Sequence, residues 1–228
     1  MQPEELAKTI DHTLLRCEAT SADVEVLCRE AAEYHFAAVC LFPHYVSMAA
    51  SLLKGTDVKT CTVISFPFGA DTPRIKALAA DEAVRRGADE VDVVINVSAL
   101  LSGELGLVRD ELAGIVRAVR VRGVNTGHGQ VIVKAIIETC YLDDRYKRLA
   151  CHICEQAGVD FVKTSTGVGP QGATVKDVEL LRDCLDAGIG VKASGGIRTA
   201  ADAERMIGAG AVRLGTSSGV AIMEELLA

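Results

Sequence analysis

Three lysines interrupt successive runs of apolar residues, and they raise the first chemical question about this chain. Each lies near the end of a strand-like run: Lys134 in Val131–Ile137, Lys163 in Phe161–Thr164 and Lys192 in Gly190–Ala193. An ammonium group among apolar residues is costly to bury unless it is paired or loses its proton. Three such lysines in succession predict a pocket that needs positive charge and an amine nucleophile.

Schiff-base chemistry is a reaction that such a pocket can support. Two ammonium groups on adjacent strands repel each other, so one of them loses its proton at a lower pH. A neutral lysine amine can attack a carbonyl substrate and form an imine. A carboxylate such as Asp92 can move protons, directly or through water. Structural salt bridges are the alternative, but three lysines beside an acid favour a catalytic site.

The elements that must position these lysines alternate along the whole chain as apolar runs and amphipathic helical stretches. We expect strands at Thr9–Thr13, Phe36–Phe42, Cys61–Phe66, Glu90–Asn96, Val131–Ile137, Phe161–Thr164, Val191–Ala193 and Val212–Gly215. Several runs are apolar on both faces, which is typical of parallel strands covered by helices. Eight strand–helix units favour a single-domain (β/α)8 TIM barrel over residues 1–228.

Local signals mark where the helices begin and end. Three Thr-x-x-Asp segments resemble capping boxes: Thr20–Asp23, Thr174–Asp177 and Thr199–Asp202. In Asp71–Pro73, a cap residue precedes a proline at the first helical turn. Five glycines between a helical stretch and a strand are expected at left-handed helix ends: Gly87, Gly123, Gly158, Gly188 and Gly210.

Strand alternation predicts that the charged side chains converge. Asp92 shares a face with Asn96, and Lys163 shares a face with Phe161, because side chains alternate along a strand. If the charged members point inward, Asp92, Lys134, Lys163 and Lys192 meet near the barrel axis. Active sites of such barrels lie at the C-terminal ends of the strands.

Two turns rich in Gly and Ser predict a phosphate site. Ser194–Gly196 ends the seventh strand, and Gly215–Gly219 ends the eighth and opens the last helix. Backbone N–H groups at such turns and helix N-termini bind anions, and barrels often place phosphate after their last two strands. Ordinary turns are the alternative.

Other polar residues have less specific patterns. The segment Asp11–Thr13 either places polar groups at the barrel mouth or caps a turn, and Cys40 is either a mouth residue or core. Glu138–Thr139 either orients the lysines or satisfies loop amides. No role is assigned to four histidines: His35, His44, His128 and His152.

Composition narrows the classes of partner. The net charge of −7 and the 4% aromatic content argue against nucleic acid. No apolar run is long enough for a membrane helix, and no signal peptide is evident, so we expect a cytoplasmic protein. Eight scattered cysteines suit a reducing compartment. The Cys151–Cys154 pair falls in a helical stretch and is expected to pack in the core.

The motifs together resemble one family closely, the class I, metal-independent deoxyribose-phosphate aldolases. The matching stretches run through almost the whole chain: Ile10–Leu15, Phe36–Cys40, Thr60–Ile64, Ala88–Asn96, Val133–Thr139, Asp160–Gly167, Gly190–Thr199 and Arg213–Gly219. The resemblance implies reversible cleavage of 2-deoxy-D-ribose 5-phosphate into D-glyceraldehyde 3-phosphate and acetaldehyde. It also implies a homodimer or larger homo-oligomer, with no metal or cofactor.

The resemblance further implies individual roles. Lys163 forms the Schiff base, Lys192 is the neighbouring cation, and Asp92 relays protons with Lys192. The implied substrate-binding residues are Asp11, Lys134, Thr166, Gly195, Gly196, Gly215, Ser217 and Ser218. Two features depart from the family pattern. The sequence ends at Leu226–Ala228 without the Tyr-bearing tail of many members, and Val168 stands where some members carry a basic residue.

Two other functions remain open at this point. An aldolase for a different sugar phosphate would use another donor, such as dihydroxyacetone phosphate. A non-catalytic sugar-phosphate sensor would bind its ligand without forming an imine, but such a binder has no need of an activated lysine.

Overall fold

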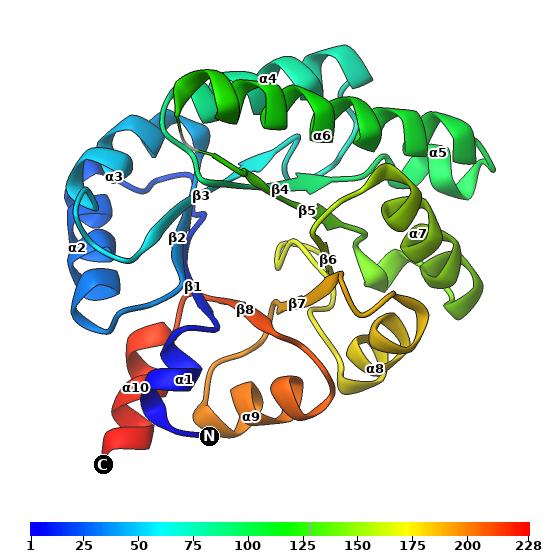
Figure 1. Ribbon diagram of the computed structural model, residues 1–228. Coiled ribbons are helices and arrows are strands. Elements are labelled where there is room, and N and C mark those ends of the chain that lie inside the picture. The colour runs from blue at the N-terminus through cyan, green and yellow to red at the C-terminus, as the bar shows by residue number, and fades with distance from the viewer. Residues whose placement is uncertain (128) are drawn as a thin grey trace.

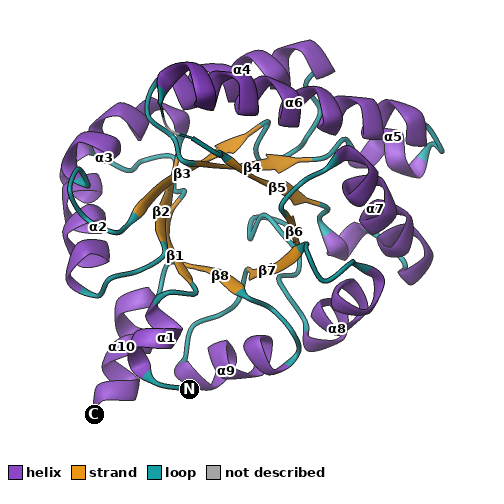
Figure 2. Ribbon diagram, in the orientation of Figure 1, coloured by secondary structure: helices purple, strands orange, loops and turns teal. Residues whose placement is uncertain are grey.

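Eight parallel strands close into a ring in sequence order, and helices surround the ring (Figures 1 and 2). The computed structural model describes residues 1–127 and 129–228. The strands are β1 (Ile10–Leu14), β2 (Ala38–Leu41), β3 (Lys59–Ile64), β4 (Glu90–Val94), β5 (Ile132–Ile136), β6 (Phe161–Lys163), β7 (Gly190–Ser194) and β8 (Arg213–Thr216). This arrangement confirms the predicted TIM barrel, including its short first strand.

Helices connect and flank the strands. The α-helices are α1 (Pro3–Ala7), α2 (Ser21–Glu33), α3 (Val46–Leu52), α4 (Pro73–Arg85), α5 (Val97–Leu101), α6 (Leu105–Thr126), α7 (Asp144–Ala157), α8 (Val175–Cys184), α9 (Ala200–Gly208) and α10 (Gly219–Leu227). Two short 3-10 helices, η1 (Pro43–Tyr45) and η2 (Thr139–Tyr141), follow β2 and β5. The first and last helices, α1 and α10, lie side by side, so both termini are on the same side of the ring (Figure 1).

Strand boundaries differ from the prediction where the backbone conformation or the register decides them. β3 begins at Lys59, before the expected Cys61, because Lys59 pairs with Ala38 of β2. It ends at Ile64 rather than Phe66, since Ser65 has a φ of 54°, in the left-handed region, which interrupts a strand.

The predicted caps are mostly present. Thr20 and Thr199 form full capping boxes with the aspartates three residues later. Thr174 accepts a hydrogen bond from the Asp177 amide, so its side chain also caps a helix. Thr72 precedes Pro73 at the start of α4, but its side chain makes no cap hydrogen bond.

Three of the five predicted glycine ends are found, at Gly87, Gly158 and Gly210, which have positive φ angles. Gly123 was predicted wrongly: it lies inside α6, which ends at Thr126 and has Gly127 as its left-handed C-cap. A Cβ atom at Gly123 would lie 2.5 Å from the carbonyl oxygen of Gly129, so close packing is what requires this glycine. Gly188 was also predicted wrongly, because its φ is not positive.

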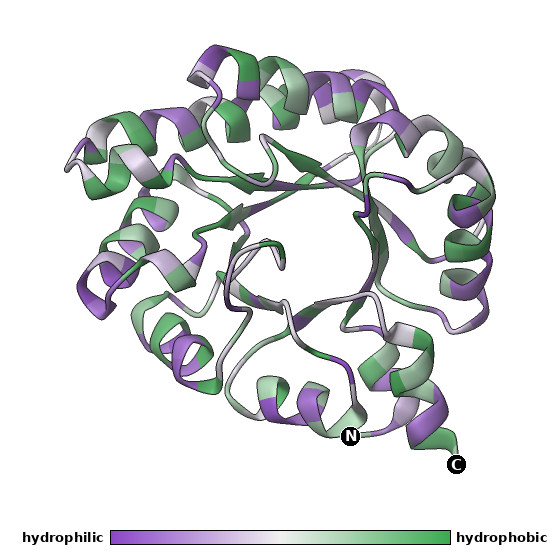
Figure 3. Ribbon diagram, turned by 180° about the vertical axis from the view of Figure 1, so that it is seen from behind, coloured by the Kyte–Doolittle hydropathy of each residue, from purple (hydrophilic) through white to green (hydrophobic). Residues whose placement is uncertain are grey.

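Hydrophobic side chains fill the layer between strands and helices. The strand ribbons are mostly hydrophobic, whereas the helices alternate between hydrophobic and hydrophilic residues, as expected for a layer buried beneath amphipathic helices (Figure 3). The Cys151 and Cys154 side chains are buried on α7, which confirms the core interpretation of that pair. Cys40 is also buried, in a small apolar cluster with Ala38, Cys61 and Val63.

Two further features expected from the sequence are the lack of a membrane-spanning helix and the position of His128. No described helix has the length and apolar character that a membrane crossing demands. His128 lies outside the described residues.

A buried ion pair joins α4 to α6 and gives a stability prediction. Lys76 Nζ donates to Glu111 Oε1 at 2.6 Å and to the Val94 carbonyl at 2.9 Å. Burial lowers the pKa of Lys76 and raises that of Glu111. Lys76→Met strands the Glu111 carboxylate, so we expect the free energy of unfolding to fall by about 3–5 kcal/mol in urea titrations.

The matched control for this prediction is the double variant with Lys76→Met and Glu111→Leu. Replacing both ions by apolar groups removes the stranded charge, so the double variant should recover most of the lost stability. Equal loss in the single and double variants would contradict the prediction.

Candidate active site

Seven acidic and basic side chains of the described residues meet inside the barrel. Their charges are divided between the two halves of the chain. The acids come from β1 and β4, and the cations come from β5 to β8: Asp11, Glu90 and Asp92 against Lys134, Lys163, Lys192 and Arg213. With every group ionised, four cations would face three carboxylates. A single deprotonated lysine would therefore make the cluster neutral.

The Asp92 carboxylate contacts all three lysines. Its Oδ2 accepts hydrogen bonds from Lys163 Nζ at 2.7 Å and from Lys192 Nζ at 2.6 Å. Its Oδ1 accepts from Lys134 Nζ at 3.0 Å and from the Cys61 thiol at 3.2 Å. Burial raises the pKa of Asp92, but the three ammonium groups outweigh burial and hold this pKa well below its ordinary value. The carboxylate is therefore ionised and saturated with donors.

Strand register explains why these groups meet. Lys163 and Lys192 are direct partners across β6 and β7, and Asp92 is the partner of Lys134 across β4 and β5. Each pair therefore points to the same side of the sheet. The structure thus brings together the four side chains that alternation had placed near the axis.

The three lysines differ in how many acids they contact. Lys134 Nζ contacts Glu90 and Asp92 and lies 3.7 Å from Asp11 Oδ2. Lys192 Nζ contacts both Asp11 and Asp92. Burial lowers the pKa of both lysines, but these carboxylates outweigh burial and raise it overall. Among the described residues, Asp92 is the one acidic partner of Lys163 Nζ.

Arg213 completes the cluster at the start of β8. Its guanidinium donates to Asp11 Oδ1 at 2.8 Å, lies 3.3 Å from Glu90 Oε2 and stacks over the Phe161 ring. Burial lowers the pKa of Arg213, but Asp11 and Glu90 together raise it above its ordinary value. Arg213 therefore stays charged and fixes the orientation of Asp11.

Buried acids and a thiol inside the barrel surround the ammonium group of Lys134. Asp11, Cys61 and Glu90 lie close enough to share a metal ion, and so do Cys40, Cys61 and Asp92. Lys134 Nζ, however, contacts Cys61 at 3.4 Å as well as Glu90 and Asp92. The lysine already supplies the positive charge that these donors need.

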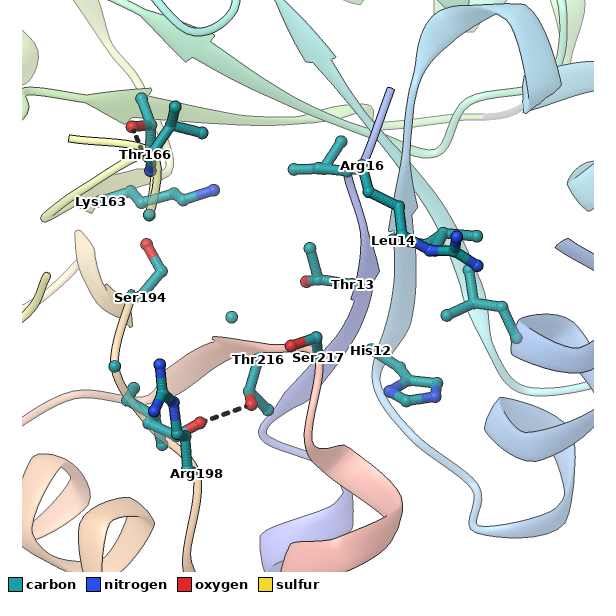
Figure 4. A pocket seen from close by; sticks show the side chains of 18 of the residues that line it. His12, Thr13, Leu14, Arg16, Lys163, Thr166, Ser194, Arg198, Thr216 and Ser217 are labelled. Carbon is teal, nitrogen blue, oxygen red and sulfur yellow. Dashed lines mark hydrogen bonds between the residues drawn. The ribbon is translucent and has the colours of Figure 1, made fainter. Parts of the chain in front are cut away.

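A cavity of about 590 Å³ opens above this cluster, at the C-terminal ends of the strands. Lys163 lines it, whereas Lys134 and Lys192 lie beneath it with side chains that are 0% exposed. Figure 4 shows the Lys163 side chain extending into the cavity, across from Thr13 and Ser217. Of the three lysines, Lys163 is thus the one that a ligand can reach.

The wall beside Lys163 contains most of the expected substrate-binding residues. Thr166, Gly195, Gly196, Gly215 and Ser217 line the cavity. A Cβ atom at Gly215 would lie 3.2 Å from Lys192 Cε, so glycine leaves room for that lysine.

Three other predicted binding residues do not line the cavity. Asp11 and Lys134 lie in the charged cluster beneath it. Ser218 occupies the N-cap position of α10 without a side-chain cap hydrogen bond, and its amide donates to Thr216 Oγ1 at 2.9 Å, so this amide is already engaged.

The sequence model that represents the DeoC/LacD family aldolases matches residues 6–225 of this chain. The chain belongs to this aldolase family. It is 54% identical over 220 residues to the deoxyribose-phosphate aldolase of Thermoanaerobacter sp. strain X514, with 96% of each chain covered. It is 52% identical over 219 residues to the enzyme of the same name from Streptococcus gordonii, covering 96% of both.

A solved structure agrees with this DeoC/LacD assignment. The deoxyribose phosphate aldolase of Aeropyrum pernix, described as a unique tetramer, superposes with a TM-score of 0.90 at 39% identity. The match covers 100% of this chain and 93% of that one. The barrel and its order of elements are therefore those of a DeoC/LacD aldolase.

The residues with less specific sequence patterns have distinct places in this DeoC/LacD aldolase. In the segment Asp11–Thr13, Asp11 points into the charged cluster, while Thr13 and His12 line the cavity. His12 Nε2 contacts Glu30 Oε2 at 2.7 Å, and burial lowers the pKa of this histidine. Glu138 accepts a hydrogen bond from the Thr166 amide, so it satisfies a loop amide rather than contacting a lysine.

Sequence reasoning missed several residues of this DeoC/LacD site. Glu90 lies two positions before Asp92, so alternation along β4 could have indicated its inward direction. Arg16 and Arg198 line the cavity and were not singled out, and Arg16 is paired with Asp23 at 2.6 Å. Arg198 follows the Gly195–Gly196 turn closely and lines the same cavity as Val168, so it supplies a cation there.

Proposed function

We propose that this family member is a class I aldolase that reversibly cleaves 2-deoxy-D-ribose 5-phosphate into D-glyceraldehyde 3-phosphate and acetaldehyde. The observation that carries the proposal is the position of Lys163, which alone of the three clustered lysines lines the cavity. It is supported by relatives named deoxyribose-phosphate aldolase at more than 50% identity. We also propose that residues 1–228 form a single domain.

Lys163 is the proposed nucleophile because it lines the cavity and its amine contacts a single carboxylate of the described residues, that of Asp92. Lys134 and Lys192 each contact at least two carboxylates, which hold them as ammonium ions. Among the clustered lysines, Lys163 is therefore the one whose amine is both accessible from the cavity and least engaged by carboxylates.

The reaction then follows from the position of the amine. Lys163 Nζ attacks the aldehyde carbon C1 of the open-chain sugar, and loss of water gives an iminium ion. A base removes the proton of the C3 hydroxyl, the C2–C3 bond breaks, and its electron pair enters the iminium. Glyceraldehyde 3-phosphate leaves with C3 as its aldehyde carbon. Protonation of the enamine at C2 and hydrolysis release acetaldehyde and restore the amine.

Asp92 and Lys192 are the proposed proton-transfer groups. They contact each other at 2.6 Å, and Asp92 contacts the nucleophile at 2.7 Å, so a proton can pass between them without side-chain movement. Both lie beneath the cavity, and a water molecule would complete the path to C2 and to the C3 hydroxyl. Asp11 holds Lys192 in place from below, and Arg213 in turn holds Asp11.

The phosphate group is proposed to bind at the turns after β7 and β8. Gly195, Gly196, Gly215 and Ser217 line this wall, and α10 begins beside it, so backbone N–H groups and the helix dipole favour an anion. Arg198 adds a positive charge. Because the Ser218 amide is engaged with Thr216, Ser218 contributes through its place at the helix start.

Activity with two donors tests the proposed substrate. We expect purified protein to release acetaldehyde and glyceraldehyde 3-phosphate from 2-deoxyribose 5-phosphate, measured with coupled dehydrogenases. In the synthetic direction, acetaldehyde should serve as donor and dihydroxyacetone phosphate should not. Use of dihydroxyacetone phosphate would favour an aldolase for a different sugar phosphate, and saturable binding without turnover would favour a sensor.

The cellular compartment and the oligomeric state of the protein are also matters of proposal. We infer a cytoplasmic enzyme that acts on small molecules, supported by the free state of all its cysteines and by its acidic balance. A homodimer or larger homo-oligomer is supported by the tetramer described for the Aeropyrum pernix relative. Sedimentation in solution measures this state directly.

A further inference from the structure

Glu138, directly after β5, has an unusual backbone and a buried carboxylate. Its φ and ψ are 53° and 68°, in the left-handed region, and the residue is 3% exposed. Non-glycine residues rarely adopt this conformation, and they persist where the surroundings impose it, often beside functional sites. The contacts of the Glu138 side chain indicate why its surroundings impose this conformation.

The Glu138 carboxylate holds the first part of the loop that follows β6. Its Oε1 and Oε2 each lie 3.2 Å from the Thr166 amide nitrogen, which donates to them. Gly169 of the same loop packs against the carboxylate, since a Cβ atom there would lie 3.5 Å from Glu138 Cδ. The Thr166 hydroxyl in turn accepts a hydrogen bond from the Val168 amide at 3.1 Å.

The far end of this loop is fixed against the turn after β7. The Ala173 amide donates to the Ser194 and Gly195 carbonyls at 3.0 and 3.1 Å. A Cβ atom at Gly172 would lie 2.2 Å from the Gly195 carbonyl oxygen, so the two backbones are in direct contact. The loop, residues 164–174, is therefore held by Glu138 on one side and by the Gly195 turn on the other.

This loop forms part of the cavity wall beside the proposed nucleophile. It starts immediately after Lys163, and its residues Thr166, Gly167 and Val168 line the cavity. Glu138 does not line that cavity, so it can act on a ligand there only through the loop. The Gly195 turn, which the loop contacts, is on the wall assigned to phosphate.

We propose that Glu138 is a positioning residue: its carboxylate orients the Thr166 amide and the loop 164–174 so that this wall fits the phosphorylated end of the substrate. The inference rests on the proposed function for the identity of the ligand. The left-handed backbone of Glu138 turns the side chain toward Thr166. The carboxylate, rather than the backbone strain, is what the loop requires.

Two substitutions separate the carboxylate from the backbone. Glu138→Gly removes the carboxylate but suits the left-handed conformation, so its effects cannot arise from added strain. Glu138→Gln keeps one oxygen that can accept from the Thr166 amide. For Glu138→Gly we expect KM for 2-deoxyribose 5-phosphate to rise about tenfold with kcat within about threefold, and Glu138→Gln should restore most of the loss.

Unphosphorylated 2-deoxyribose and amide hydrogen exchange give the discriminating readouts. The rise in KM should be absent with the unphosphorylated sugar, and exchange in residues 164–174 should be faster in Glu138→Gly than in the wild type. Equal losses with both sugars would indicate a general structural role and overturn the proposal, as would wild-type kinetics in Glu138→Gly.

Failure of the proposed function remains distinguishable from failure of this inference. If the wild-type protein does not cleave the sugar phosphate, the proposed function is wrong, and hydrogen exchange alone decides the role of Glu138. Faster exchange confined to the loop in Glu138→Gly supports positioning by the carboxylate. Unchanged exchange there overturns it.

Discussion

Replacing Lys163 with arginine should lower kcat for 2-deoxyribose 5-phosphate at least about a thousandfold, the scale of losing a covalent nucleophile. A guanidinium stays protonated in proteins, so it preserves the positive charge but cannot supply the neutral amine that attacks the carbonyl. With acetaldehyde and borohydride, the wild-type chain should gain one ethyl group, located on Lys163 by peptide mass spectrometry. The Lys163→Arg variant should gain none at this site.

Lys192→Arg is the matched control for this first prediction. Arginine keeps a cation beside Asp11 and Asp92, so the label should still appear on Lys163, although the changed shape should slow its formation. Trapping on Lys192 or Lys134 in the wild-type protein would show that the nucleophile is assigned wrongly. Full activity of Lys163→Arg would exclude the Schiff-base mechanism.

Replacing Asp92 with asparagine should affect both catalysis and stability. The amide cannot neutralise the ammonium groups of Lys134, Lys163 and Lys192, which Asp92 contacts in a buried site. Removing one partner of a buried ionic cluster typically lowers the free energy of unfolding by about 3–5 kcal/mol. Loss of the proton-transfer carboxylate should lower kcat about a hundredfold or more.

The lowered pKa of Asp92 also predicts the direction in which stability changes with pH. The folded-state pKa of Asp92 is well below its ordinary value of 3.8, so the unfolded chain binds more protons in acid. The stability that Asp92 contributes is therefore complete above this ordinary value and is lost as the pH falls below it. Asp92→Asn should flatten the dependence of unfolding free energy on pH in this acidic range.

Asp183→Asn is a suitable control for the Asp92 experiments, because Asp183 is an exposed carboxylate on α8. It should leave unfolding free energy within about 0.5 kcal/mol of the wild type, as expected for surface substitutions. Urea titrations at several pH values measure both variants. A wild-type unfolding curve for Asp92→Asn would show that the charged cluster does not depend on this carboxylate.

The sequence predicted the barrel and the central lysines for related reasons. Strands covered on both faces appear as short apolar runs, and a charged residue such as Lys163 is conspicuous within one. Alternation along each strand then gives the direction of its side chain. These are local properties, and they require no knowledge of which strands are neighbours.

Other parts of the site depend on distances between strands that no local pattern contains. The contact of Arg213 with Asp11 joins the last strand to the first, and it exists only because the ring closes. The difference between Lys163 and Lys192 lies in the number of acids around each amine, which charge arguments from sequence treated alike. The engagement of the Ser218 amide with Thr216 likewise depends on the detailed turn before α10.

Glu138 illustrates a third kind of limit. The sequence placed Glu138 after a strand and left open whether it orients lysines or binds loop amides. Its left-handed backbone and its bond to Thr166 decide between these possibilities, and neither is visible in residue types. A glutamate carries no sequence signal for positive φ, unlike glycine or asparagine.

The separation of charges between the two halves of the barrel bears on how the chain folds. The acids of β1 and β4 are neutralised by cations of the other half, partly between the neighbouring strands β4 and β5 and partly across the closed ring. A half-barrel of either kind would carry charges of one sign on its inner face without their partners, so we expect four strands alone to be less stable than the closed ring. The same division makes the two halves electrostatically complementary as separate fragments. We therefore expect each half to stabilise the other, through charged groups that are also the ones assigned to catalysis.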